Sequence, residues 1–184
     1  MLIQMPDPVA DVLARLKKAG YQASIVGGCV RDSLMGFTPQ DWDVTTSALP
    51  EETKRALGDL RVLETGVRHG TVTALCGGME IEITTYRVDG KYSDSRHPDS
   101  VTFTRSLKED LARRDFTVNA MAYDGREVID YYGGAEDLRN RIIRCVGDPD
   151  QRFCEDSLRI LRGLRFSACL GFAIEPDTSD SICK

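Results

Sequence analysis

The sequence predicts an α+β fold, in which helices and short strands share the first part of the chain and a helical region follows. The 184 residues suffice for one large domain or two small ones. Residues Asp7–Ala19 repeat apolar side chains at helical spacing, and Gln22–Val26 is a short apolar run typical of a buried strand. Near the other end, Pro149 opens a helical region that includes a strongly amphipathic segment, Glu155–Leu170. We therefore expect a sheet packed with helices.

The intervening elements are short and closely spaced. A helix is predicted at Cys29–Met35 after the turn Gly27-Gly28, and a second strand at Asp41–Thr45. Pro50 stands near the first position of the predicted helix Leu49–Leu57, where proline is tolerated. The other predicted strands are Arg61–Leu63, Gly70–Cys76, Glu80–Thr85, Val128–Tyr132 and Ile142–Val146, and the other helical segments are Ser106–Arg114 and Glu136–Asn140.

Two segments have a distinctive chemistry of their own. Arg87–Ser100 is polar and contains one glycine and one proline, which is typical of a long mobile loop. His97 lies in that loop, but a lone histidine there is more often solvated than catalytic. In Glu155–Leu170, we expect an apolar face built by Leu158, Leu161, Leu164 and Ala168, with Asp156, Arg159 and Arg162 on the other side.

The stretch from Ile25 to Asp43 predicts a site for phosphate and metal. Gly27 and Gly28 have no Cβ, so another group can approach the backbone where a helix begins, and Arg31 adds a charged donor. Asp41 and Asp43 alternate around Trp42, so both carboxylates are expected on one side of a strand. Their repulsion favours a cation between them, and hard oxygen ligands suit Mg²⁺.

Composition and charge exclude several classes of protein. No apolar run approaches membrane-spanning length, and the first residues do not resemble a signal peptide. The six cysteines form no C-x-x-C pair, so we expect reduced thiols of a cytoplasmic protein without a zinc site. The net charge of −5 disfavours nucleic-acid binding, but arginines concentrate after Arg139 and predict a local basic patch.

The sequence pattern allows two interpretations of Glu82, and two of the neighbouring arginines Arg113 and Arg114. Glu82 either extends the carboxylate cluster of Asp41 and Asp43 or is a solvated residue on the outer face. Arg113 or Arg114 either holds a triphosphate or forms a charge pair at a helix C-terminus.

Asp156 and Arg159 lie three residues apart, and they are either a surface salt bridge or a pair that reads a base. Aspartate only accepts and arginine only donates, which matches the amine and ring nitrogen of cytosine and adenine. Uracil and guanine present the reverse pattern, so the pair would accept CTP and ATP and reject UTP and GTP.

Five motifs in order resemble one family. GGCVRD, DWD, RRDFTVNA, DYYGGAEDL and EDSLRILRGLRF are similar to the motifs of class II tRNA nucleotidyltransferases, which include the bacterial CCA-adding enzymes and poly(A) polymerases. The resemblance implies a polymerase-β-like nucleotidyltransferase head, with a mixed or antiparallel sheet flanked by helices, over residues 1–146. It also implies that 147–184 begin an all-helical neck.

The resemblance implies roles for individual residues and partners. Asp41 and Asp43 are expected to bind two Mg²⁺ ions, so that the tRNA 3′-hydroxyl attacks the α-phosphate of CTP or ATP in line. The loop around Lys91–Arg96 is similar to the flexible loop that family members use when they change from C to A addition. The residues expected to bind the nucleotide are Gly27, Gly28, Arg31, Arg113, Asp156, Arg159, Arg162 and Arg165.

The chain departs from the family in length, because family members usually run to roughly twice this size. The family's body and tail are absent, so we expect a catalytic fragment that keeps the nucleotide site and binds tRNA poorly. Alternatives are a poly(A) polymerase, a variant that adds CC or A only, or a nucleotide-binding fragment without full activity.

Overall fold

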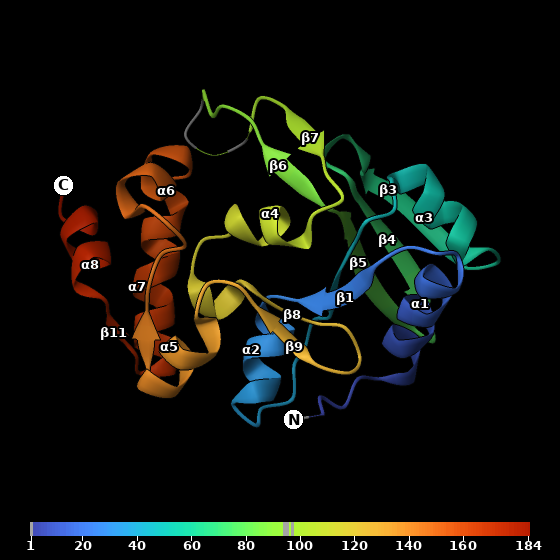
Figure 1. Ribbon diagram of the computed structural model, residues 1–184, viewed down its shortest axis with the longest axis horizontal. Coiled ribbons are helices and arrows are strands. Elements are labelled where there is room, and N and C mark those ends of the chain that lie inside the picture. The colour runs from blue at the N-terminus through green and yellow to red at the C-terminus, as the bar shows by residue number, and fades with distance from the viewer. Residues whose placement is uncertain (1, 94–95, 97) are drawn as a thin grey trace.

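The computed structural model describes residues 2–93, 96 and 98–184 (Figure 1). Most elements lie within one or two residues of their predicted positions. The helices are α1 Asp7–Lys18, α2 Gly28–Leu34, α3 Pro50–Leu57, α4 Leu107–Ala112, α5 Gly134–Asn140, α6 Pro149–Glu155, α7 Leu158–Leu170 and α8 Pro176–Ile182, with 3-10 turns η1 Val67–His69 and η2 Thr117–Asn119. The strands are β1 Ala23–Val26, β2 Asp43–Thr46, β3 Arg61–Gly66, β4 Thr71–Cys76, β5 Met79–Thr85, β6 Arg87–Asp89, β7 Val101–Phe103, β8 Met121–Tyr123, β9 Val128–Asp130, β10 Ile142–Ile143 and β11 Ala173–Ile174.

A seven-stranded mixed sheet is the centre of the fold. Its strand order is β3-β4-β5-β2-β1-β8-β9, and all neighbouring strands are antiparallel except β2 and β5. Helices α1 and α3 lie at one end of the molecule, whereas α6, α7 and α8 gather at the other (Figure 1). The predicted α+β architecture with a mixed sheet and flanking helices is confirmed.

The two faces of this sheet have different cores, because successive side chains of a strand point to opposite faces. Ile25 of β1 belongs to the core that α1, α2 and α3 cover, and its neighbour Val26 belongs to the core beneath α4. The same alternation in β2 places Val44 in the first core, while Thr45 donates to Asp110 of α4 over 3.0 Å. Asp43, at the start of β2, therefore lies on the α4 side of the sheet.

A third core joins the sheet region to the C-terminal helices. Phe116 and Ile143 pack there with Phe153 of α6 and Phe166 of α7. Strand β10 also pairs in parallel with β11, which follows α7. The predicted head–neck boundary after Val146 thus has shared packing on both sides, and the division into 1–146 and 147–184 stays a prediction.

The prediction of a single helix over Glu155–Leu170 is wrong, because the segment contains the end of α6 and the whole of α7. Helix α6 ends at Glu155, and Asp156 has an extended backbone with φ −142° and ψ 103°. Its carboxylate accepts a hydrogen bond from the Leu158 backbone N–H over 3.0 Å, at the first turn of α7. Aspartate competes for backbone N–H groups in this way, and that competition separates the two helices.

The apolar face predicted for this segment does not face the protein interior. Leu158, Leu161 and Leu164 are 41%, 62% and 45% exposed. The side of α7 that packs against the sheet region instead carries Gly163 and Phe166. A hydrophobic stripe identifies an amphipathic helix, but it does not determine which other element covers that stripe.

The predicted loop Arg87–Ser100 begins in a two-stranded ribbon. Strand β6 pairs in antiparallel register with β7, and the pairing continues from Gly90 to Ser100 and from Lys91 to Asp99. The prediction for His97 lies outside the described residues. Across the described chain, we find no helix with the length and apolarity needed to cross a membrane.

Candidate active site

A cavity of about 620 Å³ opens where the start of β2, the start of α2 and helix α7 meet. It brings together residues from both ends of the chain. The predicted site residues on its wall are Gly27, Gly28, Arg31, Asp41, Asp43, Arg162 and Arg165. Arg113, Asp156 and Arg159 are not on this wall.

The two aspartates form an acidic group in the cavity. Asp43 begins β2, whereas Asp41 lies in the segment before the strand. Asp43 is accessible to solvent, yet the cavity walls displace part of its hydration, and this desolvation raises its pKa. The neighbouring carboxylates Glu82 and Asp41 raise the pKa further, and the Arg114 guanidinium opposes them. The repulsion that neighbouring carboxylates exert on Asp43 would be removed by a divalent cation bound among them.

Glu82 lies directly beside Asp43 in the parallel pairing of β5 with β2. The charge of Glu82 raises the pKa of Asp43. The Glu82 side chain is nevertheless exposed and does not line the cavity. Within the described residues, no three histidine, cysteine, aspartate or glutamate side chains are grouped closely enough to hold a metal ion. The assignment of Asp41 and Asp43 as metal ligands therefore stays a prediction, and so does the role of Glu82.

The glycine turn brings a guanidinium close to the aspartates. Gly27 has φ +81°, a region that L side chains rarely adopt. A Cβ at Gly27 would lie 3.2 Å from Nη1 of Arg114. The Arg114 guanidinium therefore lies against the glycine turn, where its charge acts on Asp43 and burial lowers its pKa.

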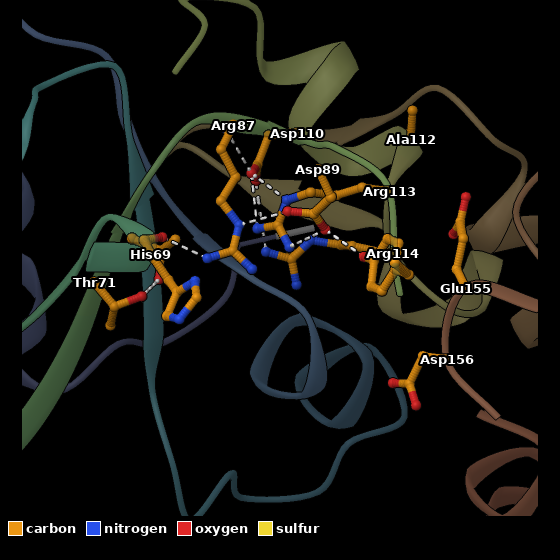
Figure 2. Close-up of polar contacts among 12 residues, drawn as sticks. His69, Thr71, Arg87, Asp89, Asp110, Ala112, Arg113, Arg114, Glu155 and Asp156 are labelled. Atoms are coloured by element: carbon orange, nitrogen blue, oxygen red, sulfur yellow. Dashed lines mark hydrogen bonds and ion pairs between the residues drawn. The ribbon is translucent and has the colours of Figure 1, made fainter. Parts of the chain in front are cut away.

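Arg114, and not Arg113, lines the cavity. Arg113 turns away and donates to Asp110 over 3.0 Å and 2.9 Å, with Asp89 at 3.7 Å. Figure 2 shows Asp110 among Arg87, Arg113 and Arg114. The sequence pattern allowed either arginine to hold a triphosphate, and the family resemblance implied Arg113. In the structure, Arg114 is the one of the two that lines the cavity.

Asp110 is the fully buried anion that organises these guanidiniums. Burial would raise the pKa of Asp110, but the charges of Arg113 and Arg114 outweigh it and hold the pKa below its usual value. The carboxylate also accepts from the hydroxyl of Thr45, two residues after Asp43 in β2. Asp110 thus ties the arginine-bearing end of α4 to the strand that carries the acidic group.

Two further cavity arginines, Arg31 and Arg162, contact polar side chains of the RRDFTVNA segment. Arg31 donates to Asn119 over 2.7 Å, and Nη2 of Arg162 lies 2.7 Å from the Asp115 carboxylate. Asp115 also accepts from the Asn119 side chain over 3.2 Å. Asp115 and Asn119 were not predicted as site residues, although both belong to a motif that carried the resemblance.

The proposed base-reading pair lies beside the cavity on the α6–α7 junction. Asp156 and Arg159 approach to 4.0 Å, whereas Arg159 pairs more closely with Glu155, at 3.0 Å. Arg159 also donates to the backbone carbonyl of Arg113 over 3.1 Å. Asp156 is partly exposed and lies apart from Asp110 and the arginines around it (Figure 2). The structure places the pair together, and its function in base selection stays a prediction.

The arginines after Arg139 do not form a simple basic patch. Arg144 pairs with Asp137 and Glu175, and Arg152 pairs with Glu155. These carboxylates offset much of the positive charge that the sequence predicts there. Arg139 and Arg141 are exposed but do not line the cavity, whereas Arg162 and Arg165 are exposed on the cavity wall, where an anion can reach them.

Comparison with known proteins identifies the family of this chain. Residues 23–144 match the family profile described as "Poly A polymerase head domain". The chain belongs to this family. The resemblance to class II tRNA nucleotidyltransferases is confirmed by the relatives that follow.

The chain is 50% identical to the CCA-adding enzyme of Leuconostoc mesenteroides subsp. mesenteroides, over 98% of this chain and 46% of that protein. It is 49% identical to the CCA-adding enzyme of Streptococcus pneumoniae strain R6, over 96% of this chain and 45% of that protein. The chain thus spans less than half the length of these two CCA-adding enzymes.

Solved structures of the family show the same fold. The crystal structure of the Bacillus stearothermophilus CCA-adding enzyme in complex with CTP superposes with a TM-score of 0.86 at 44% identity, covering 96% of this chain and 43% of that one. A tRNA nucleotidyltransferase complexed with a primer tRNA and an incoming ATP analog gives a TM-score of 0.73 at 35% identity, covering 93% and 48%.

Proposed function

We propose that this chain carries the nucleotidyl-transfer site of an enzyme that adds nucleotides from CTP and ATP to the 3′ end of tRNA. The observation that supports this most is the cavity, whose wall carries Asp43 at the start of β2, Asp41 just before that strand, and arginines from α2 and α7. This arrangement matches the two needs of the reaction, a metal-binding group and a positive cradle for a triphosphate. The absence of membrane-spanning helices in the described chain and the unpaired cysteines are in keeping with action in the cytoplasm.

Asp41 and Asp43 are the residues that would hold divalent cations, and we propose two Mg²⁺ ions. When bound, these ions activate the RNA 3′-hydroxyl and offset the charge of the triphosphate. Arg31, Arg162 and Arg165 hold the phosphates in line with that hydroxyl. The charge of Arg114, beside the glycine turn, favours the ionised form of Asp43. Asp156 and Arg159, beside the cavity, select the base.

The relatives' names support the choice of substrates. Two solved relatives are described with CTP and with a primer tRNA and an ATP analog. Their similarity extends over 96% and 93% of this chain. The family profile also carries the name of poly(A) polymerases, so addition of a long A tail is the second candidate.

The test uses a tRNA that lacks its CCA end, incubated with this chain, Mg²⁺ and each labelled nucleoside triphosphate. We expect CTP and ATP to be incorporated into a short, defined end, at a low rate because the chain spans less than half of its relatives. A long A tail would favour the poly(A) polymerase. Binding of nucleotides without any incorporation would reduce the chain to a nucleotide-binding fragment.

The Asp43→Ala variant tests the metal assignment directly. We expect it to abolish incorporation and the stabilisation of the fold by Mg²⁺ in a thermal unfolding assay, because one of two carboxylate ligands is lost. Glu80→Ala is the matched control, since Glu80 is an exposed carboxylate on the neighbouring strand β5 and does not line the cavity. Activity retained by Asp43→Ala would contradict the assignment.

A further inference from the structure

The ring of Phe166 lies among three guanidiniums of the cavity. The guanidinium carbons of Arg31, Arg162 and Arg165 lie 5.0, 5.4 and 5.3 Å from the ring centroid. All three distances are within the range of a cation–π interaction. Arg31 belongs to α2, and Arg162 and Arg165 belong to α7. The one ring therefore contacts guanidiniums from two helices that are far apart in the sequence.

The ring is itself held rigidly in the third core. Phe166 is only 8% exposed and packs edge-to-face on Phe116, with the centroids 5.9 Å apart and the planes at 86°. Gly163, one turn earlier in α7, makes room for the same ring of Phe116, because a Cβ there would come within 2.9 Å of its Cζ. The platform beneath the three arginines is therefore part of the packed interior.

The three arginines differ in how far their charge is neutralised. Arg162 pairs with Asp115, and Arg31 pairs with Asp32 at 2.8 Å. For Arg165, by contrast, the Phe166 ring is the partner that the described part of the chain provides. A carboxylate orients a guanidinium and cancels its charge, whereas an aromatic face orients it and leaves the charge available.

We propose that Phe166 is a positioning residue that gathers Arg31, Arg162 and Arg165 into a preformed cradle for the polyphosphate chain of a nucleoside triphosphate. This rests on the proposed function and assigns a role to a residue outside the predicted site. Three like charges this close repel one another, so without the ring the guanidiniums would spread before a ligand arrives. Holding them in place beforehand lowers the entropic cost of binding.

The proposal makes a specific demand on the ligand. Phe166 acts on the phosphates and not on the base, so its loss weakens binding of CTP, ATP and inorganic tripolyphosphate by one common factor. Because several cation–π contacts of modest strength are lost together, we expect about a tenfold increase in Kd. In a tRNA assay the effect belongs to KM, while kcat changes little, since the acidic group is untouched.

The experiment measures Kd for CTP, ATP and tripolyphosphate by calorimetry in the wild type, Phe166→Leu and Phe166→Tyr. Leucine removes the aromatic face, and tyrosine keeps it. We expect Phe166→Leu to weaken all three ligands equally and Phe166→Tyr to restore binding. Leu161→Ala is the matched control, because Leu161 is an exposed residue of the same helix away from the cavity.

A double-mutant cycle separates positioning from loss of packing. Arg165→Gln alters an exposed side chain, so it tests the cradle even when Phe166→Leu lowers stability. In the Arg165→Gln background, Phe166→Leu is expected to cost less binding than in the wild type. Equal costs in both backgrounds, or a loss of CTP binding without loss of tripolyphosphate binding, would overturn the proposal.

The outcomes also distinguish this proposal from the proposed function. Tripolyphosphate binding through Phe166 without incorporation into tRNA would leave the cradle standing and refute the transferase. Incorporation into tRNA with unchanged tripolyphosphate binding in Phe166→Leu would leave the transferase standing and refute the cradle.

Discussion

Arg114 lies against the backbone of Gly27, where a Cβ would come within 3.2 Å of its Nη1. This contact joins the glycine turn after β1 to the end of α4, nearly ninety residues later in the chain. The positive charge of Arg114 in turn lowers the pKa of Asp43 and so favours the ionised carboxylate. The glycine is thus needed at two levels, for its positive φ and for the space that the guanidinium occupies.

The variant Gly27→Ala separates these two needs when it is compared with Gly36→Ala. Both glycines have φ +81°, but a Cβ at Gly36 would meet nothing within 4 Å. Each substitution is expected to cost on the order of 1–3 kcal/mol of stability through backbone strain. Gly27, with ψ −132°, lies outside the left-handed helical region that other residues can adopt. Only Gly27→Ala should also displace Arg114 and weaken nucleotide binding in calorimetry. Equal nucleotide affinities of the two variants would show that Arg114 does not depend on the turn.

The variant Asp110→Asn tests the buried anion of the arginine cluster. At neutral pH we expect it to lose about 3–5 kcal/mol of unfolding free energy, because removal of one partner leaves buried guanidiniums uncompensated. Urea denaturation followed by circular dichroism measures the difference. The Glu80→Gln variant, which changes an exposed carboxylate, is the control.

The pH dependence of that difference has a definite sign. The folded-state pKa of Asp110 lies below its usual value, so its stabilising contribution is complete above the unfolded pKa. The contribution is lost as the pH falls through the folded pKa, where the wild type becomes protonated. The gap between the wild type and Asp110→Asn should therefore narrow in strongly acidic solution. A gap that stays constant from neutral to acidic pH would show that charge is not what Asp110 supplies.

The variant Asp156→Asn tests base selection with little change to the fold. Asparagine caps a helix about as well as aspartate, so the hydrogen bond from the Leu158 N–H is expected to survive. Its amide, however, can also donate, which weakens the preference for the amine of cytosine and adenine. We expect the ratio of affinities for CTP over UTP to fall, as measured by calorimetry. Asp148→Asn, at the cap of α6, should leave that ratio unchanged.

Much of the fold was predictable because it depends on short-range patterns. The alternation of Ile25 and Val26 is enough to indicate a strand buried on both faces, and both residues are in cores. The apolar spacing of α1 and the capping residue Ser106 of α4 likewise act within one or two turns, and the structure has both helices. The acidic pair Asp41 and Asp43 was recognisable for the same local reason.

The errors arose where a side chain's environment depends on distant residues. The leucines of α7 satisfy the amphipathic pattern, yet the head packs against Gly163 and Phe166, because Phe116 needs the space that glycine leaves. The ribbon of β6 and β7 was missed because each strand has only three residues, too few to show a clear alternation of apolar and polar side chains.

The sequence by itself determined the motifs, the order of the elements and the residues that supply carboxylate and guanidinium groups. Only the tertiary structure decided that Arg114 and not Arg113 faces the cavity, and that Phe166 gathers arginines from α2 and α7. The physical reason is range. Helical and strand periodicities act over a few residues, whereas the direction of a guanidinium is set by the buried charge or ring that packing brings beside it from elsewhere in the chain.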